Sequence, residues 1–303
     1  MQGSLCRVRS ALTGSPYSHT MHPTQSALTS LSRQEAFSSP SPIPRSQIVR
    51  RDNASVIVES RHTNSETWAV LMPQPGSHEL TGPFIASATG VARQLFGSTI
   101  RVASPALSPE ECEAYIAAGY RIRTNLHLLV ADLRRPAVAR VGRSHPPATQ
   151  LTTFRPRDEA HVLATDLAAF GAGHEMDALE LASAFRATPF SRLRVARIGG
   201  EIAGFALFGR ADRRGYLQRL AVHPRAQGRG LGRQLVLDGF SWCRRRRVHR
   251  IVVNTEHGNL PALHLYTAVG FEMSPMELCI MEHVVPGRST GPDRSPANKA
   301  PRA

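Results

Sequence analysis

The sequence contains almost no lysine and no paired cysteine motif. Lys299 is the single lysine among 37 basic residues, and the four cysteines include no Cys-x-x-Cys pair. Scattered cysteines are typical of reduced thiols in a cytoplasmic protein, and we expect that localisation here. None of the 13 histidines is spaced from a cysteine or another histidine as zinc ligands usually are. We therefore expect no metal site.

Long apolar runs are also missing. No stretch approaches the roughly 18 residues that a membrane-spanning helix needs. The N-terminus shows no compact apolar segment after its basic residues, so we expect neither a membrane partner nor a secretory signal. With 303 residues, of which 41% are hydrophobic, the chain is long enough for two modest domains.

A net charge of +14 raises the question of a nucleic-acid partner. The positive excess is spread over the whole chain, and the polar ends contribute more than their share. The densest cluster, Arg244–Arg247, lies where a predicted helix ends, and cations are favourable at this negative end of the helix dipole. No aromatic residues alternate with this cluster to stack on bases. Charge alone therefore favours nucleic-acid binding, and no motif supports it.

Two familiar phosphate-binding loops are absent, and a third kind of loop is present. The sequence has neither Gly-x4-Gly-Lys-Ser/Thr nor Gly-x-Gly-x-x-Gly. Residues 217–233 instead read as an apolar strand, a proline turn, a glycine-rich loop and the start of an apolar helix. Such a unit directs backbone N–H groups and a helix dipole at one point. Gly230 and Gly232 leave room for a bulky anion, which predicts pyrophosphate recognition.

Two blocks of sequence resemble the GCN5-related N-acetyltransferase (GNAT) family. Gln227, Gly230 and Gly232 fill the pattern Gln-x-x-Gly-x-Gly, which resembles the family's acetyl-CoA loop. Residues 250–271 look like the family's fifth strand followed by its Asn-x6-Tyr-x3-Gly-Phe helix and turn. The matching residues of this second block are Asn259, Tyr266, Gly270 and Phe271.

The resemblance implies an α/β fold, a twisted mixed sheet with helices on both faces. The hydrophobic pattern agrees with this order of elements, and Gly199-Gly200 suits a hairpin turn. We expect strands at Leu151–Arg155, Arg192–Ile198, Glu201–Gly209, Gly215–Val222, Ile251–Val253, near Phe271 and at Glu277–Glu282, and helices at Asp158–Phe170, Met176–Thr188, from Gly230 to about Arg245 and around Tyr266.

The first half contains an internal echo of the second. Tyr115, Gly119 and Tyr120 repeat the Tyr-x3-Gly-aromatic spacing of the later block, and a closing strand, Leu126–Leu133, follows. We interpret this as a smaller, degenerate GNAT-like half, a layout that resembles tandem members of the family such as mycothiol synthases. The alternative is an unrelated α/β packing module. Ordered pieces are predicted at Ser55–Val58, Thr67–Met72, Phe84–Leu95 and Glu110–Ala118.

These patterns predict five segments. Residues 1–46 and 285–303 are expected to be disordered tails, 48–134 the degenerate half, 135–149 a proline-containing linker, and 150–284 the N-acetyltransferase domain. No Gln-x-x-Gly-x-Gly pattern occurs before residue 150. We therefore expect all cofactor contacts in the second half, so that a chain starting near Thr149 still binds acetyl-CoA.

The resemblance also implies roles for individual residues. Backbone N–H groups of the strand before the loop would stabilise the oxyanion formed during acyl transfer. The loop and helix start would hold the pyrophosphate, Asn259 would contact the CoA arm, and Tyr266 would be the general acid. The residues expected to bind the cofactor are Leu220, Ala221, Val222, Gln227, Gly228, Arg229, Gly230, Leu231, Gly232, Arg233 and Asn259.

The general base is less evident. Ribosomal-protein alanine acetyltransferases of this family carry a glutamate five residues before the equivalent of Asn259, and this chain has Asn254 there. Glu256 would share a strand face with Asn254 and is the tentative base. His223 and His257 remain alternatives.

The sequence thus predicts an acetyl-CoA-dependent N-acetyltransferase that moves an acetyl group directly to a primary amine. The acceptor, a small molecule or a peptide, is not indicated. A non-catalytic CoA-binding sensor is the first alternative, and the presence of Tyr266 favours the enzyme over it. A basic nucleic-acid-binding protein is the second alternative.

Overall fold

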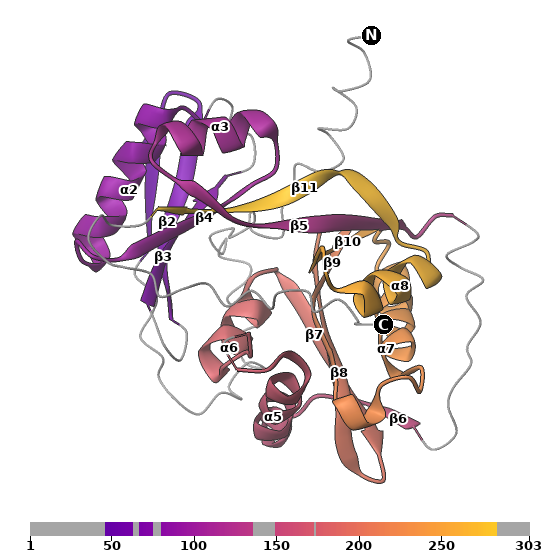
Figure 1. Ribbon diagram of the computed structural model, residues 1–303. Coiled ribbons are helices and arrows are strands. Elements are labelled where there is room, and N and C mark those ends of the chain that lie inside the picture. The colour runs from indigo at the N-terminus through magenta and orange to yellow at the C-terminus, as the bar shows by residue number, and fades with distance from the viewer. Residues whose placement is uncertain (1–45, 63–66, 75–79, 136–148, 173, 284–303) are drawn as a thin grey trace, which may run out of the picture.

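The computed structural model describes residues 46–62, 67–74, 80–135, 149–172 and 174–283 (Figure 1). Apart from Ser46, Arg135 and Thr149, the predicted tails and linker lie outside the described residues. Within the described ranges, no helix is both long enough and apolar enough to cross a membrane.

The described strands form one mixed sheet of 11 strands, in the order β1-β2-β3-β4-β11-β5-β10-β9-β8-β7-β6. Most neighbouring strands are antiparallel, whereas β3–β4 and β9–β10 are parallel. The strands are β1 Ser46–Arg51, β2 Ala54–His62, β3 Thr67–Pro73, β4 Arg101–Ala106, β5 Arg121–Asp132, β6 Thr149–Thr153, β7 Phe190–Ile198, β8 Glu201–Ala211, β9 Arg214–Val222, β10 Arg250–Glu256 and β11 Glu272–His283.

The last strand of each half pairs with strands of the other half. Strand β5, from the first half, pairs with the whole length of β10, from Asp132 opposite Arg250 to Leu126 opposite Glu256. Strand β11, from the second half, pairs with β4 of the first half and with β5. Figure 1 shows β5 and β11 side by side, running across the molecule between the two groups of helices.

This exchange joins the two hydrophobic cores. Leu129 and Ala131 of β5 are buried in the core beneath the helices of the second half. Met281 of β11 is fully buried in the core of the first half. The linker therefore separates the halves in sequence only, and a chain starting near Thr149 would lack a strand that pairs with β10 and lines its core.

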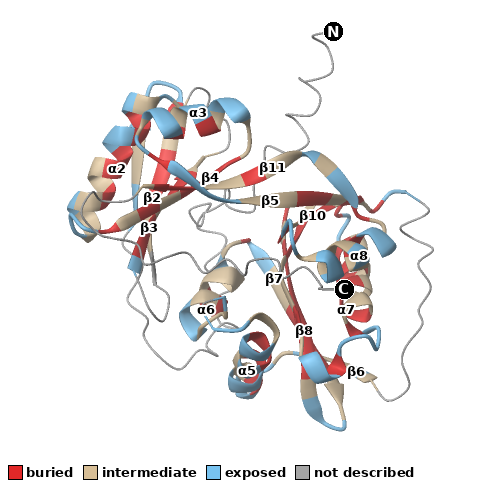
Figure 2. Ribbon diagram, viewed as in Figure 1, coloured by how far each residue is buried: buried red, intermediate tan, exposed pale blue. Residues whose placement is uncertain are grey.

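Helices cover the sheet on defined faces (Figures 1 and 2). Helices α2 and α3 pack on one face of the first half, where Phe84, Ile85 and Tyr115 are buried. Helices α5 and α6 cover one face of the second half, and α7 and α8 cover the other. The bounds are α2 Gly82–Phe96, α3 Pro109–Ala117, α5 Glu159–Phe170, α6 Ala178–Arg186, α7 Leu231–Arg244 and α8 Leu260–Ala268.

The two halves repeat one order of elements. An antiparallel hairpin (β2–β3 or β8–β9) leads into a long helix, a parallel strand and a short helix. Both short helices end alike: the N–H of Tyr120 donates to Tyr115 C=O, and that of Phe271 donates to Tyr266 C=O. Gly119 and Gly270 supply the positive φ angles, 85° and 98°, that these turns require.

Three features differ from the expected elements. Strands β1 and β4 were not predicted, because β1 is short and exposed at the sheet edge and β4 contains Pro105 and small residues. The two strands expected near Phe271 and Glu277 form one strand, β11, whose irregularity between Met273 and Glu277 accommodates Pro275.

Candidate active site

Strand β9 carries a bulge and then diverges from its parallel neighbour. Its register with β8 shifts between Leu217 and Arg219, so Gln218 is the extra residue. Parallel pairing with β10 covers three residue pairs and ends at Tyr216 opposite Val252. Beyond this point β10 pairs only with β5 among the described strands. The rest of β9 therefore has an open edge, on the side opposite β8, that is not paired with β10.

The predicted oxyanion segment lies along this edge. The N–H of His223 donates to Ala203 C=O of β8 at 2.9 Å. Because successive N–H groups of a strand point to opposite edges, those of Val222 and Leu220 point away from β8. The N–H of Ala221 points toward β8 instead. Of the three predicted residues, the structure thus directs Leu220 and Val222 to the open edge.

The glycine loop connects this edge to helix α7. The Gln227 amide donates to Val222 C=O at 3.0 Å and so fastens the loop to the end of β9. Gly228 and Gly230 have φ angles of 72° and 77°, which favour glycine. Gly230 is the residue before α7 and offers no side-chain cap, and the first helical bond runs from Gln234 N–H to its C=O.

The start of α7 is therefore built from backbone donors. The N–H groups of Leu231, Gly232 and Arg233 precede that first helical bond and lie at the positive end of the helix dipole. A Cβ on Gly232 would stand 3.0 Å from Leu265 Cδ2 of α8, so this glycine also permits close helix packing. In the first half, by contrast, the N-cap of α2 is Thr81, whose hydroxyl accepts from Phe84 N–H. The geometry at α7 suits a phosphate anion.

Tyr266 is buried on α8, beside the core that α7 and α8 share. Its ring centroid lies 5.5 Å from that of Phe271. Burial raises the pKa of Tyr266 to about 12, although the positive charge of Arg219 opposes the shift. Its hydroxyl has no hydrogen-bond partner within the described residues. The hydroxyl is therefore protonated at neutral pH.

Tyr115, the matching residue of the first half, has a different environment. It is fully buried, and its hydroxyl lies 2.5 Å from Ser104 Oγ, which also donates to Leu71 C=O. Burial raises the pKa of Tyr115 above its usual range. This hydroxyl is held within the core of the first half.

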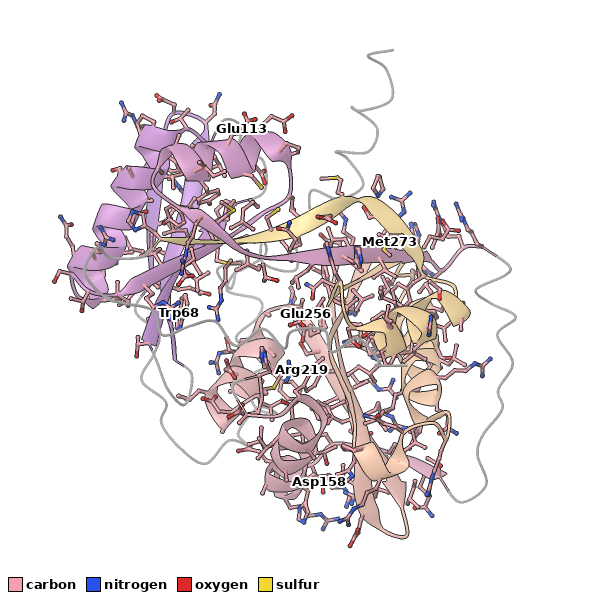
Figure 3. All side chains as sticks on the ribbon, in the orientation of Figure 1. Trp68, Glu113, Asp158, Arg219, Glu256 and Met273 are labelled. Carbon is pink, nitrogen blue, oxygen red and sulfur yellow. The ribbon has the colours of Figure 1, made fainter. Side chains whose placement is uncertain are left out.

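The candidate bases occupy different places. Glu256 is exposed at the end of β10, and by strand alternation it shares a face with Asn254 and Val252, opposite the α7–α8 core. Figure 3 shows Glu256 and Arg219 on the α6 side of the sheet. His257 lies in the next turn, 3.1 Å from Glu277. His223 accepts a capping hydrogen bond from Arg225 N–H at its Nδ1.

Asn259 begins α8. Its side-chain oxygen accepts from Ala262 N–H at 3.3 Å, so it is the N-cap of the helix that carries Tyr266. The oxygen is used locally, and the amide N–H groups remain for other contacts. Its contact with the CoA arm stays a prediction.

Sequence reasoning missed a buried ion pair beneath the open edge. Arg219, at the bulge of β9, donates to both carboxylate oxygens of the fully buried Asp166, at 2.8 and 2.6 Å. Its guanidinium lies 3.6 Å from the Phe170 ring centroid. Burial raises the pKa of the nearby Glu180 carboxyl on α6. Two features of the sequence could have indicated this ion pair: an arginine within an apolar strand and an aspartate within a helix.

Sequence comparison places the second half among known proteins. Residues 160–271 match the model of the Acetyltransferase (GNAT) family. Over 133 residues the chain is 35% identical to a mycothiol acetyltransferase from Thermomonospora curvata, a match that covers 42% of this chain and 45% of that protein. The chain thus matches less than half the length of this curated relative.

Structural comparison extends the likeness to both halves. A tandem GNAT protein from the clavulanic acid biosynthesis pathway aligns with a TM-score of 0.61 and 15% identity, covering 88% of this chain and 89% of that protein. A GCN5-related N-acetyltransferase from Kribbella flavida aligns with a TM-score of 0.57 and 14% identity, covering 88% and 98%. The expected fold, a GNAT-like sheet preceded by a smaller GNAT-like half, is confirmed.

Proposed function

Because residues 160–271 belong to the acetyltransferase (GNAT) family, we propose that the protein transfers the acetyl group of acetyl-CoA directly to a primary amine. The observation that supports the proposal is the open edge of β9, where Leu220 and Val222 direct N–H groups, followed in the chain by the glycine loop and the start of α7, which suits an anion. These residues fit acetyl-CoA, since its thioester and pyrophosphate need those two kinds of donor.

The chain's backbone supplies the electrostatic part of the reaction. Attack by an amine on a thioester converts the carbonyl oxygen into an oxyanion, and fixed N–H donors stabilise that charge without reorganising. Leu220 and Val222 hold their N–H groups in place because β8 and the Gln227 hydrogen bond fix β9. The loop from Gly228 to Arg233 would hold the pyrophosphate and so set the position of the thioester along β9.

Tyr266 would donate a proton to the departing thiolate. With a pKa of about 12 it remains protonated throughout the neutral range. A phenol of this pKa is a weaker acid than a free thiol in water. The buried surroundings that raise the pKa of Tyr266 also disfavour a free thiolate, so they raise the proton affinity of the departing sulfur and favour transfer of the proton to it. The buried site strengthens this hydrogen bond, since the low local dielectric leaves the developing charge unscreened.

Glu256 is the proposed base for the amine, which must lose a proton to attack. Its carboxylate is exposed on the α6 side of the sheet, the side on which Arg219 and the buried Asp166 form their ion pair. The ion pair would hold the bulged part of β9 in position beside the incoming amine. The chain is similar to mycothiol acetyltransferases. The amine that those enzymes acetylate is therefore the first acceptor to test.

The test is acetyl-CoA turnover, followed by release of the free thiol, with a panel of amines. The panel contains the amine acetylated by mycothiol acetyltransferases, polyamines, simple amino sugars and peptides with free N-termini. Turnover that Tyr266→Phe suppresses would support the proposal. A rise in melting temperature with acetyl-CoA, but no turnover with any acceptor and no acetylated product by mass spectrometry, would favour a non-catalytic CoA-binding protein.

A further inference from the structure

Three side chains that are far apart in the sequence converge at the exchanged strands. His127 lies on β5, His257 in the turn after β10, and Glu277 on β11. Their ligating atoms all lie within 4.8 Å of one another. His257 Nε2 is 3.1 Å from Glu277 Oε1, and His127 Nδ1 is 3.9 Å from the same oxygen.

The sheet register fixes this arrangement. His127 is directly opposite Glu277 on one neighbouring strand and Thr255 on the other. Directly opposite residues project to the same face, so His127 and Glu277 meet because of the strand exchange. The turn that carries His257 is closed by a hydrogen bond of 3.1 Å from Asn259 N–H to Glu256 C=O. Backbone pairing thus positions all three side chains.

The donor set is that of a transition-metal site. Two imidazoles and one carboxylate suit Zn²⁺ and its neighbours, whereas Mg²⁺ and Ca²⁺ prefer all-oxygen ligands. A tetrahedral Zn²⁺ with bonds of about 2.0–2.2 Å separates its ligands by about 3.3–3.6 Å. The two nitrogen–oxygen distances in the structure, 3.1 and 3.9 Å, bracket that range.

We propose that His127, His257 and Glu277 form a binding site for a divalent transition metal, with Zn²⁺ as the reference ion. The imidazole rings are stacked, with centroids 3.9 Å apart and planes inclined by 15°, so the more exposed His257 would turn out of the stack for both rings to face one ion. The side chains of His257 and Glu277 are 45% and 41% exposed, which leaves a fourth position for water.

A bound ion would join the two halves of the protein. It would tie β5 of the first half to β11 and to the β10–α8 turn of the second, two residues from the helix cap Asn259. Local spacing in the sequence gave no sign of this site, because its ligands come from three separate elements.

The test is metal binding by the untagged full-length protein after removal of metal with a chelator. Calorimetry with Zn²⁺ is expected to show one site per chain, and Co²⁺ is expected to give visible absorption bands typical of low-coordinate nitrogen and oxygen ligation. His257→Ala and Glu277→Gln each remove one ligand and should weaken Zn²⁺ binding at least about tenfold. The exposed His264 of α8 provides the matched control, because His264→Ala removes a neighbouring histidine outside the cluster.

Equal zinc affinity in His257→Ala and His264→Ala would overturn the proposal, as would a wild-type chain without stoichiometric binding. In that case the three side chains form only an ion pair beside stacked rings. Circular dichroism of each variant checks folding, and Glu277→Gln keeps the shape of the side chain. The readout is binding, so the outcome does not depend on acetyl transfer.

Discussion

Replacing Tyr266 with phenylalanine separates chemistry from packing. Phenylalanine keeps the ring that lies 5.5 Å from Phe271 and removes only a hydroxyl without a hydrogen-bond partner among the described residues. The melting temperature and the affinity for acetyl-CoA should therefore change little. Turnover should fall by about 10²–10⁴-fold, the range for a positioned acid. At about 1.36 kcal/mol per tenfold, this corresponds to roughly 2.7–5.4 kcal/mol of transition-state stabilisation.

Tyr115→Phe provides the matched control, since it changes the same position of the other half. This variant loses the 2.5 Å contact with Ser104 and should cost about 0.5–1.5 kcal/mol of stability while turnover stays normal. The assays are thiol release under conditions where chemistry is rate-limiting, and thermal unfolding. Wild-type turnover in Tyr266→Phe, or an equal loss of turnover in both folded variants, would refute the assignment.

Three further predictions concern the loop, the strand exchange and pH. Gly230→Val places a branched side chain at a φ of 77° and should abolish the rise in melting temperature with acetyl-CoA, whereas Gly97→Val, at a φ of 110° in open space, should keep it. Leu129→Ala should destabilise the full-length chain by about 2–5 kcal/mol and weaken acetyl-CoA binding, because Leu129 is fully buried in the core of the second half. Ile116 is 52% exposed, so Ile116→Ala should be nearly neutral. If Leu129→Ala unfolds like the wild type, the shared core is disproved. The raised pKa of Tyr266, about 12, keeps this residue protonated to about pH 10. The fall of kcat at alkaline pH should therefore have the same midpoint in the wild type and in Tyr266→Phe. An alkaline midpoint that is present in the wild type and absent in the variant would contradict the raised pKa.

The candidate site was predictable where its chemistry lies in contiguous segments. The glycine loop and the Tyr266 helix each occupy a short run, so the residue types and their spacing carry the signal. The same holds for the echo of Tyr115 and Tyr266, because both turns depend on a glycine with positive φ and a following aromatic ring. The binding roles of these residues stay predictions until they are measured.

Other parts of the site depend on partners distant in the sequence. Neither Arg219 nor Asp166 belongs to a motif, and their ion pair exists because β9 and α5 pack together. The direction of the N–H groups of Leu220 and Val222 follows from the hydrogen bond of His223 to β8. Strand β4 was missed because local propensity does not favour a strand there, and pairing with β3 and β11 compensates.

By itself, the sequence determined the family resemblance, the order of most elements and the two-part layout, because these depend on local spacing and hydrophobic periodicity. Only the tertiary structure decided which strand closes which half. Strands β5 and β11 each contain an apolar segment that is typical of a strand, and such a local pattern cannot distinguish pairing within a half from exchange between halves. Leu129 of the first half is buried in the core of the second half, and Met281 of the second half is buried in the core of the first. Both burials follow from that long-range pairing, and so does the convergence of His127, His257 and Glu277.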